Sequence, residues 1–261
     1  MKLIRTASIF AIALGSALVA NSSFAGYSWT FTGNGNTCPT TGCAESDTFS
    51  GKTITSTATG WYSETTSSAP IQQAAALREW DGLGVQANSN DTGSPNHATD
   101  NNGFYDSVLF DFGGESVELD QVVMGWHQDG DFSLLRYTGN STPVLTGNSY
   151  SDLTATEGWE LVGNYFCGCG SSTNVDYTFD VNSQNKSSSY WLVAAINPAY
   201  FSNTNYIGND YFKIKTVAGT HTPSVPPTQV SAPATLALML LGGMLLWSNN
   251  RTNVRPVRFA A

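Results

Sequence analysis

Apolar and polar residues alternate along most of the chain between residues 27 and 217. Tyr27, Trp29 and Phe31, for example, alternate with polar residues, and a period of two places their rings on one face of a strand. Small polar and glycine-rich stretches separate such segments, as turns separate strands. The pattern predicts an all-β domain, an antiparallel β-sandwich of the jelly-roll type. Strands are expected at residues 27–32, 52–58, 61–64, 107–112, 116–126, 132–137, 159–167, 175–181, 190–196 and 211–217.

Two segments interrupt the alternation. Residues 71–80 include the run Ala74-Ala75-Ala76-Leu77-Arg78, whose members are good helix formers, so a short helix is one interpretation of this segment. A strand leading into Leu83 is the other interpretation. Residues 86–103 form a long polar stretch without periodicity, and loops of this length inside a compact domain are usually functional or flexible.

The first 25 residues have the three parts of a secretory signal peptide. Lys2 and Arg5 form a positive start, residues 7–20 are mainly apolar, and Ser23-Phe24-Ala25 has the small-x-Ala pattern of a cleavage site. Signal peptidase is therefore expected to cut after Ala25. The β domain is then expected to span residues 26–217.

The other end of the chain has the features of a membrane anchor. Residues 218–229 are rich in proline and threonine and predict a stiff linker, and residues 234–247 are apolar without a charge. Such a run is expected to form a transmembrane helix, although it is shorter than the roughly 20 residues that span a bilayer comfortably. Residues 248–261 form a basic tail, which should stay on the cytoplasmic side of the inner membrane. Its arginines are Arg251, Arg255 and Arg258.

Charge is distributed unevenly along the chain. All 20 acidic residues lie between Glu45 and Asp210, whereas five of the 11 basic residues lie in the two terminal segments. The domain between them is therefore more acidic than the net charge of −9 for the whole chain suggests. Such a surface repels phosphates, so nucleic acid is not expected as a partner.

The four cysteines all follow the expected cleavage point, in a compartment where disulfides persist. Local bridges, Cys38 to Cys43 and Cys167 to Cys169, are one of three possible connectivities. The second bridge would be strained in an extended strand, because Cα atoms two residues apart approach the limit of about 7 Å. Cross-pairing of the two halves and a zinc site remain as alternatives, but the spacings do not match the usual zinc pattern.

No catalytic site is expected. The three histidines do not belong to a nucleophile or zinc-protease motif, and no phosphate-cradling glycine loop is present. Paired carboxylates can act as acid and base in glycosidases, but such residues usually occupy solvated turns. The pairs in this sequence are Asp129 with Asp131 and Glu115 with Glu118.

Calcium is a better candidate as a ligand of the domain, because hard cations bind several carboxylate, amide and backbone oxygens. The polar loop supplies four candidate side chains at close spacing, although the spacing is not that of an EF-hand. These are Asp100, Asn101, Asn102 and Asp106. Asp129, Asp131 and Asp210 stand at the ends of other expected strands and are candidates to converge on them.

Tryptophan side chains suggest a second ligand class, extracellular polysaccharide. Exposed indole rings stack on sugars in many β-sandwich modules, whereas most tryptophans pack in cores. The candidates are Trp61, Trp80, Trp126 and Trp159.

The C-terminal arrangement resembles the PEP-CTERM sorting signals of Gram-negative bacteria, which pair a short motif with a hydrophobic segment and a basic end. Residues 230–261 would be this signal, with Val230, Ser231, Ala232 and Pro233 as its motif. The sequence departs from the family in lacking the Pro-Glu-Pro triplet, and is similar to a Val-Ser-Ala-Pro variant. The resemblance implies that a membrane enzyme, an exosortase, cleaves near the motif and releases the protein to the cell surface or extracellular matrix.

The preceding domain resembles the XDP1-type exosortase-dependent surface proteins. This resemblance implies a secreted protein with a structural or interaction role and no established chemistry; a polysaccharide-binding module is the alternative. It rests on the segments at residues 82–85, 94–101, 125–126, 129–132, 135–139 and 210–213.

Overall fold

Two antiparallel sheets make up the domain. The computed structural model describes residues 26–33, 35–64, 68–92, 97–169, 175–203, 205 and 210–221. The predicted signal peptide, the linker beyond His221 and the predicted sorting signal lie outside these residues. Where the chain is described, every strand pairing is antiparallel, and helix is limited to two short 3-10 turns. The predicted all-β class is confirmed.

The first sheet has nine strands. Its main path runs through β13 (Tyr177–Asp180), β10 (Val117–Asp129), β16 (Tyr211–His221), β7 (Leu83–Gln86), β6 (Ala76–Glu79) and β2 (Asn36–Cys38). β1 (Tyr27–Thr30) and β8 (Thr99–Asp100) pair with β16, and β14 (Ser187–Ser188) pairs with β10.

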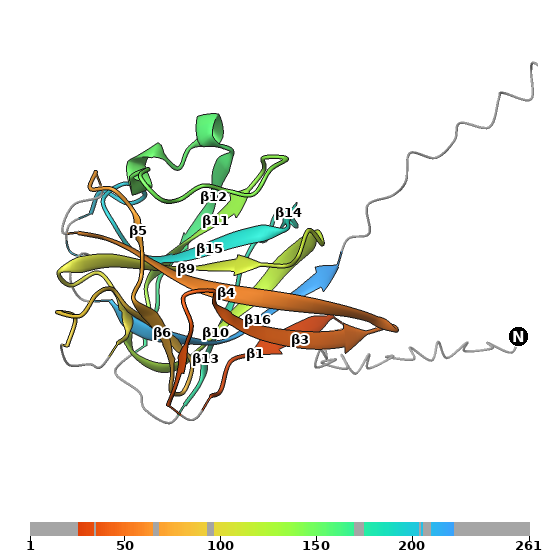
Figure 1. The fold of residues 1–261 in the computed structure, drawn as a ribbon. Coiled ribbons are helices and arrows are strands. Elements are labelled where there is room, and N and C mark those ends of the chain that lie inside the picture. Colours follow the sequence, from red (N-terminus) through yellow and green to blue (C-terminus); the bar gives the residue numbers. More distant parts are fainter. Residues whose placement is uncertain are drawn as a thin grey trace, which may run out of the picture. The chain divides into compact units, whose positions relative to one another are not determined.

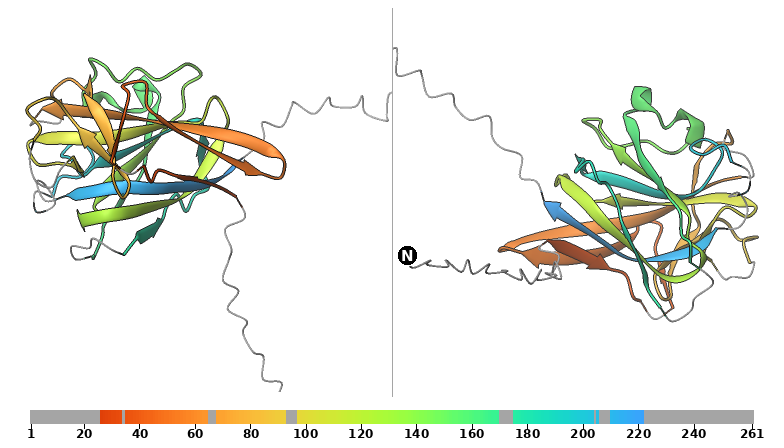
Figure 2. Two further views of the ribbon diagram at one scale, coloured as in Figure 1. Left: turned by 60° about the horizontal axis from the view of Figure 1, so that its bottom comes forward. Right: turned by 180° about the vertical axis from the view of Figure 1, so that it is seen from behind.

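The second sheet has seven strands. In order these are β12 (Trp159–Tyr165), β11 (Phe132–Tyr137), β15 (Tyr190–Ala195), β9 (Phe104–Asp111), β4 (Lys52–Glu64) and β3 (Cys43–Phe49), with β5 (Gln72–Gln73) beside β4. Figures 1 and 2 show the two sheets as layers that face each other.

The main core lies between the sheets. Trp29 and Phe212 from the first sheet and Phe110 and Trp191 from the second are fully buried in one apolar cluster. The indole nitrogen of Trp29 donates to the Ile54 carbonyl oxygen at 2.9 Å, so the buried ring also ties β1 to β4. Burial of large aromatic side chains from both sheets explains why the two layers form a β-sandwich.

A second apolar cluster covers the outer face of the seven-stranded sheet. The segment with the 3-10 turns η1 (Tyr150–Asp152) and η2 (Ala155–Glu157) packs there (Figure 1). The Tyr150 hydroxyl donates to the Tyr105 carbonyl oxygen at 2.9 Å. β15 is therefore buried on both faces, which explains why its sequence is continuously apolar rather than alternating.

The strand predictions agree with these elements over much of the chain, but β2 and β3 form where no strand is expected, and three further points are corrected. Residues 52–64 form one long strand, β4, rather than two. Residues 71–80 contain β5 and β6, so the strand interpretation of this segment holds and the helix interpretation does not. β6 pairs with both β2 and β7, and this pairing outweighs the high helix propensity of the short alanine-rich run. β16 continues to His221, so residues 218–221, predicted as the start of the linker, belong to the strand.

Within the described ranges, the chain has no helix with the length and apolar character needed to cross a membrane. The segment predicted to do so, residues 234–247, lies outside those ranges.

Candidate ligand pocket and acidic cluster

A pocket lies on the nine-stranded sheet, on the face turned away from the main core. Alternation along β16 explains its position, since Phe212 and Ile214 point into the core and Lys213 between them points the other way. Gly84 on β7 pairs with Arg78 on β6, and its neighbour Leu83 pairs with Ile214. Arg78, Gly84 and Lys213 therefore form one row across three strands.

Gly84 keeps this row open. A Cβ atom at this position would overlap the carbonyl group of His97 and lie 3.0 Å from the Lys213 Nζ atom. Only glycine leaves room for the His97 backbone to approach the sheet this closely.

The pocket has a volume of about 580 Å³. A volume of this size falls in the usual range for small-molecule and sugar sites, roughly 300–1,000 Å³. Two indole rings and several groups able to form hydrogen bonds line it together. The lining residues are Gly35, Arg78, Glu79, Trp80, His97, Trp126 and Lys213.

Lys213 is the buried cation of the pocket, with 2% of its surface exposed. Its Nζ donates to the His97 carbonyl oxygen at 3.0 Å and lies 5.7 Å from the centre of the Trp80 ring. Burial lowers the pKa of Lys213 to about 8, while the nearby Asp81 carboxylate opposes this shift. The ammonium group thus has partners, but it lies in a poorly solvated position.

Arg78 and His97 form the sides of the pocket. The Arg78 guanidinium donates to Gln86 Oε1 at 2.7 and 3.0 Å and to the Thr37 hydroxyl, which links β6 to β7 and β2. Burial lowers the pKa of His97, and the Arg78 charge adds to this effect. The histidine ring is therefore held toward its neutral form.

The four tryptophans proposed for sugar binding differ in exposure. Trp80 is 56% exposed and lines the pocket, and Trp126 lines it with 9% exposed. Trp61 is half-buried against the second apolar cluster. Trp159 is 1% exposed inside that cluster, so this candidate packs in a core and is not available to stack on a sugar. The large side chain of Trp159 fills the space beneath the η1–η2 segment instead.

Three aspartates meet at one end of the sandwich. Asp129 ends β10, Asp131 lies in the turn before β11, and Asp210 immediately precedes β16. One carboxylate oxygen from each lies within 4.8 Å of the others. At this separation two carboxylate charges repel by about 3 kcal/mol with an effective dielectric constant of about 20.

Hydrogen bonds fix the two buried members of this acidic cluster. Asp131 Oδ1 accepts the Cys167 backbone N–H at 2.5 Å. Asp210 Oδ2 accepts from Asn101 Nδ2 at 2.6 Å and from the Ile196 N–H at 3.0 Å. Asp210 Oδ1 is buried without a hydrogen-bond partner. The cluster therefore contains a buried carboxylate oxygen without a donor.

Electrostatics in the cluster follow from burial and like charge. The pKa of Asp210 is raised to about 9, mainly by burial and in addition by the neighbouring Asp131 and Asp129 carboxylates. Burial also raises the pKa of Asp131 to about 6, although the Cys167 hydrogen bond opposes this change. Both shifts favour the protonated carboxyl because the charged form is poorly solvated.

The calcium ligands predicted from the loop lie beside this cluster. Asn101 joins the two, since its Oδ1 accepts the Asp210 N–H at 3.0 Å. Asp100 Oδ1 accepts the Asn102 N–H at 2.9 Å, and Asp106 Oδ2 accepts the Asp100 N–H at 3.3 Å. Asp106 and Asn101 are buried, whereas Asn102 is exposed. One oxygen each of Asp100 and Asp106 thus accepts a backbone N–H group, whereas Asp106 Oδ1 is buried without a hydrogen-bond partner. The calcium role of the loop stays a prediction.

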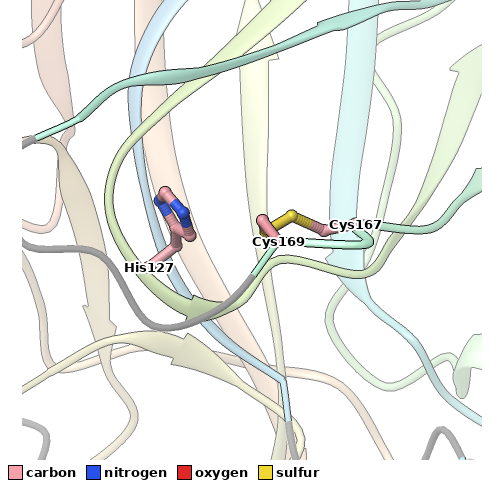
Figure 3. A group of neighbouring side chains, drawn as sticks. All are labelled: His127, Cys167 and Cys169. Atoms are coloured by element: carbon pink, nitrogen blue, oxygen red, sulfur yellow. A yellow bond between two sulfur atoms is a disulfide. The ribbon is translucent and has the colours of Figure 1, made fainter.

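The cysteines form two local disulfides, Cys38–Cys43 and Cys167–Cys169. The Cys167 and Cys169 Cα atoms are 4.9 Å apart, so the chain bends between them and is not the extended strand assumed in the sequence argument. Figure 3 shows this disulfide beside His127. Because all four sulfurs are in disulfides, none is a free thiolate, contrary to the zinc alternative.

The carboxylate pairs considered for glycosidase chemistry have different surroundings. Glu115 forms an ion pair with Lys52 at 2.6 Å and a hydrogen bond with the His221 ring at 2.9 Å, at the far end of β16 from Asp210. Asp129 and Asp131 belong to the acidic cluster described above.

Sequence reasoning missed several pocket residues. Alternation along residues 211–217 places Lys213 on the opposite face from Phe212 and Ile214, but nothing in the pattern indicates that the His97 backbone covers it. Some signal was available, because the segments that carry the resemblance supply Gly84, His97, Trp126 and Lys213 to the pocket. They also supply the three clustered aspartates.

No protein-family model matches this chain, and no curated protein matches it.

Proposed function

We propose that this protein is a secreted bacterial surface protein whose β-sandwich domain binds extracellular polysaccharide in the pocket at Trp80. The observation that carries the proposal is the exposed Trp80 ring beside a cavity of about 580 Å³. An exposed large aromatic ring next to a cavity gives a sugar an apolar face to stack on. The role is structural or adhesive, without catalysis.

Polar groups in the pocket support a sugar ligand. Arg78, Glu79 and Lys213 offer donors and acceptors for hydroxyl groups close to the two indole rings. Few, fixed polar groups beside apolar walls are the usual composition of a specific small-molecule site. The two-layered antiparallel architecture is compatible with the predicted jelly roll, which lectin domains also use.

Binding is tested by affinity electrophoresis and calorimetry with soluble neutral and uronic-acid polysaccharides. Trp80→Ala is expected to abolish retardation by the polymer that retards the wild-type protein. Phe49→Ala is the matched control, because Phe49 is also an exposed ring, 39% exposed, and does not line the pocket. If the wild type and both variants are retarded equally, the binding site lies elsewhere. If none of them is retarded, the protein does not bind these polysaccharides.

Sorting forms the second half of the proposal. The signal peptide is cut after Ala25, and the segment at residues 230–261 holds the protein in the inner membrane until an exosortase acts near Val230-Ser231-Ala232-Pro233. The support is the order of motif, apolar run and arginines in the sequence. The acidic disulfide-bonded domain suits an extracellular location.

The sorting proposal is tested by fractionating cells with and without the exosortase and determining the mature C-terminus by mass spectrometry. A shortened C-terminus in the surface fraction is expected only when the exosortase is present. An intact tail in the inner membrane of both strains would refute the sorting proposal and leave the binding proposal untouched.

A further inference from the structure

The acidic cluster of Asp129, Asp131 and Asp210 brings three carboxyl groups together at one end of the sandwich. The three carboxylates come from the β10–β11 turn and from the start of β16, and one oxygen of each lies within 4.8 Å of the others. Asp131 is 2% exposed and Asp210 is fully buried. Three carboxyl groups are therefore held together, two of them in positions where the charged form is poorly solvated.

Asp210 provides the observation that points to a ligand. Its Oδ2 atom receives hydrogen bonds from Asn101 and Ile196, which fixes the carboxylate plane. Its Oδ1 atom is buried and has no hydrogen-bond partner. A buried polar atom without a partner is unfavourable, and a bound cation is one way in which proteins satisfy such an oxygen.

We propose that Asp129, Asp131 and Asp210 bind a calcium ion that joins the β10–β11 turn to the start of β16. Calcium binds oxygens at about 2.4 Å, so two oxygens on one ion are at most about 4.8 Å apart. The separation in the cluster falls within that limit. Oxygen-only ligands select a hard cation, and water or backbone carbonyls complete the six to eight ligands that calcium takes.

This ligand set differs from the one predicted within the loop. The Asn101 amide orients Asp210 through two hydrogen bonds, which makes Asn101 a positioning residue rather than a ligand. Asp106 lies outside the group of three and accepts the Asp100 N–H. The site requires neither polysaccharide nor exosortase, so it goes beyond the proposed function.

Calorimetric titration of the full chain with CaCl₂, after removal of cations with EDTA, tests the site. One saturable event is expected, with a dissociation constant on the order of 0.1–1 mM, as in extracellular calcium modules. Asp131→Asn and Asp129→Asn should weaken it about tenfold or more, because each removes a charged ligand. Asp106→Asn should bind as the wild type does.

Two results would overturn the proposal. One is the absence of calcium binding by the wild-type chain at millimolar calcium. The other is loss of binding in Asp106→Asn with retention in Asp131→Asn, which would assign the ion to the predicted loop.

Thermal unfolding of the Asp210→Asn variant tests whether Asp210 is a calcium ligand or only stabilises the fold. Asparagine keeps an acceptor for Asn101 and Ile196 and removes a carboxyl group that can become a charged ligand. In EDTA its Tm is expected to equal or exceed that of the wild type, and calcium should raise only the wild-type Tm. A variant that is less stable in EDTA and still responds to calcium would contradict the assignment.

Discussion

Lys213 and Asp210 are three residues apart at the start of β16 and are both buried, yet their charged groups have opposite surroundings. The Lys213 ammonium has a carbonyl acceptor from His97, an indole ring and a nearby carboxylate, and it borders a cavity. Asp210 faces two other carboxylates and keeps one oxygen without a partner. A buried ionisable group can thus be accommodated either by supplying partners or by leaving a space for an ion.

The geometry around the two residues also differs. The pocket depends on a missing side chain, that of Gly84, whereas the acidic cluster depends on hydrogen bonds that fix Asp131 and Asp210. The pocket should therefore be sensitive to added volume, and the cluster to changes in charge and in the adjoining backbone.

Gly84→Ala is expected to have the largest effect. The added methyl group would overlap the His97 carbonyl, and overpacking of this kind destabilises by about 3 kcal/mol. Urea unfolding measures the loss. Gly168→Ala is the control on the side of the acidic cluster, because a Cβ atom there meets no atom within 4 Å. A Gly84→Ala protein as stable as Gly168→Ala would show that the His97 segment moves away freely.

Lys213 should give the pocket a distinct pH dependence. Its pKa falls from 10.5 to about 8 on folding, so between these values the folded chain binds fewer protons than the unfolded chain. Stability contributed by Lys213 therefore rises with pH from about 8 to 10, by at most about 1.4 kcal/mol per pH unit. The difference between wild-type and Lys213→Met unfolding free energies over this range isolates the effect.

Subtraction is needed because other groups titrate nearby. Lys213 is surrounded by other ionisable groups, namely Arg78, Asp81, Glu79 and His97. The pKa of Asp210 is raised on folding, so its titration lowers stability as the pH rises, opposite to the effect of Lys213. These groups remain in both proteins. Wild-type and variant curves that run parallel from pH 8 to 10 would show that Lys213 is solvated.

The two disulfides should affect calcium binding unequally. Replacing Cys167 and Cys169 by serine frees the backbone that donates to Asp131, so calcium affinity is expected to fall several-fold and up to about tenfold. Replacing Cys38 and Cys43 removes the link between β2 and β3 and touches none of the three aspartates, so it should leave the affinity unchanged. Titration calorimetry measures both, and equal losses would mean that the disulfides act through overall stability alone.

The contact between Trp80 and Lys213 should give the smallest effect. A cation over an exposed indole contributes about 0.5–1 kcal/mol. A double-mutant cycle with Trp80→Ala and Lys213→Met should return a coupling energy of that size. A coupling near zero would show that Trp80 serves the ligand and does not stabilise the buried lysine.

The sequence by itself determined the β architecture. Alternation in β1, β9 and β16 placed Trp29, Phe110 and Phe212 in the core, because side chains on a strand point to opposite faces in turn. The same rule failed at residues 71–80, where alanine-rich composition gave no alternation to interpret. β6 forms there because β2 and β7 lie on either side of it, which is information from distant parts of the chain.

Tertiary structure alone decided the sites. The alternation rule assigns Lys213 to the outward face, but only folding brings the His97 carbonyl over Gly84 to bury it. The sequence likewise offered several aspartates as calcium ligands, and only the meeting of the β10–β11 turn with β16 selects Asp129, Asp131 and Asp210. Local pattern fixes which face of a strand a side chain occupies, whereas its neighbours depend on contacts between residues far apart in the sequence.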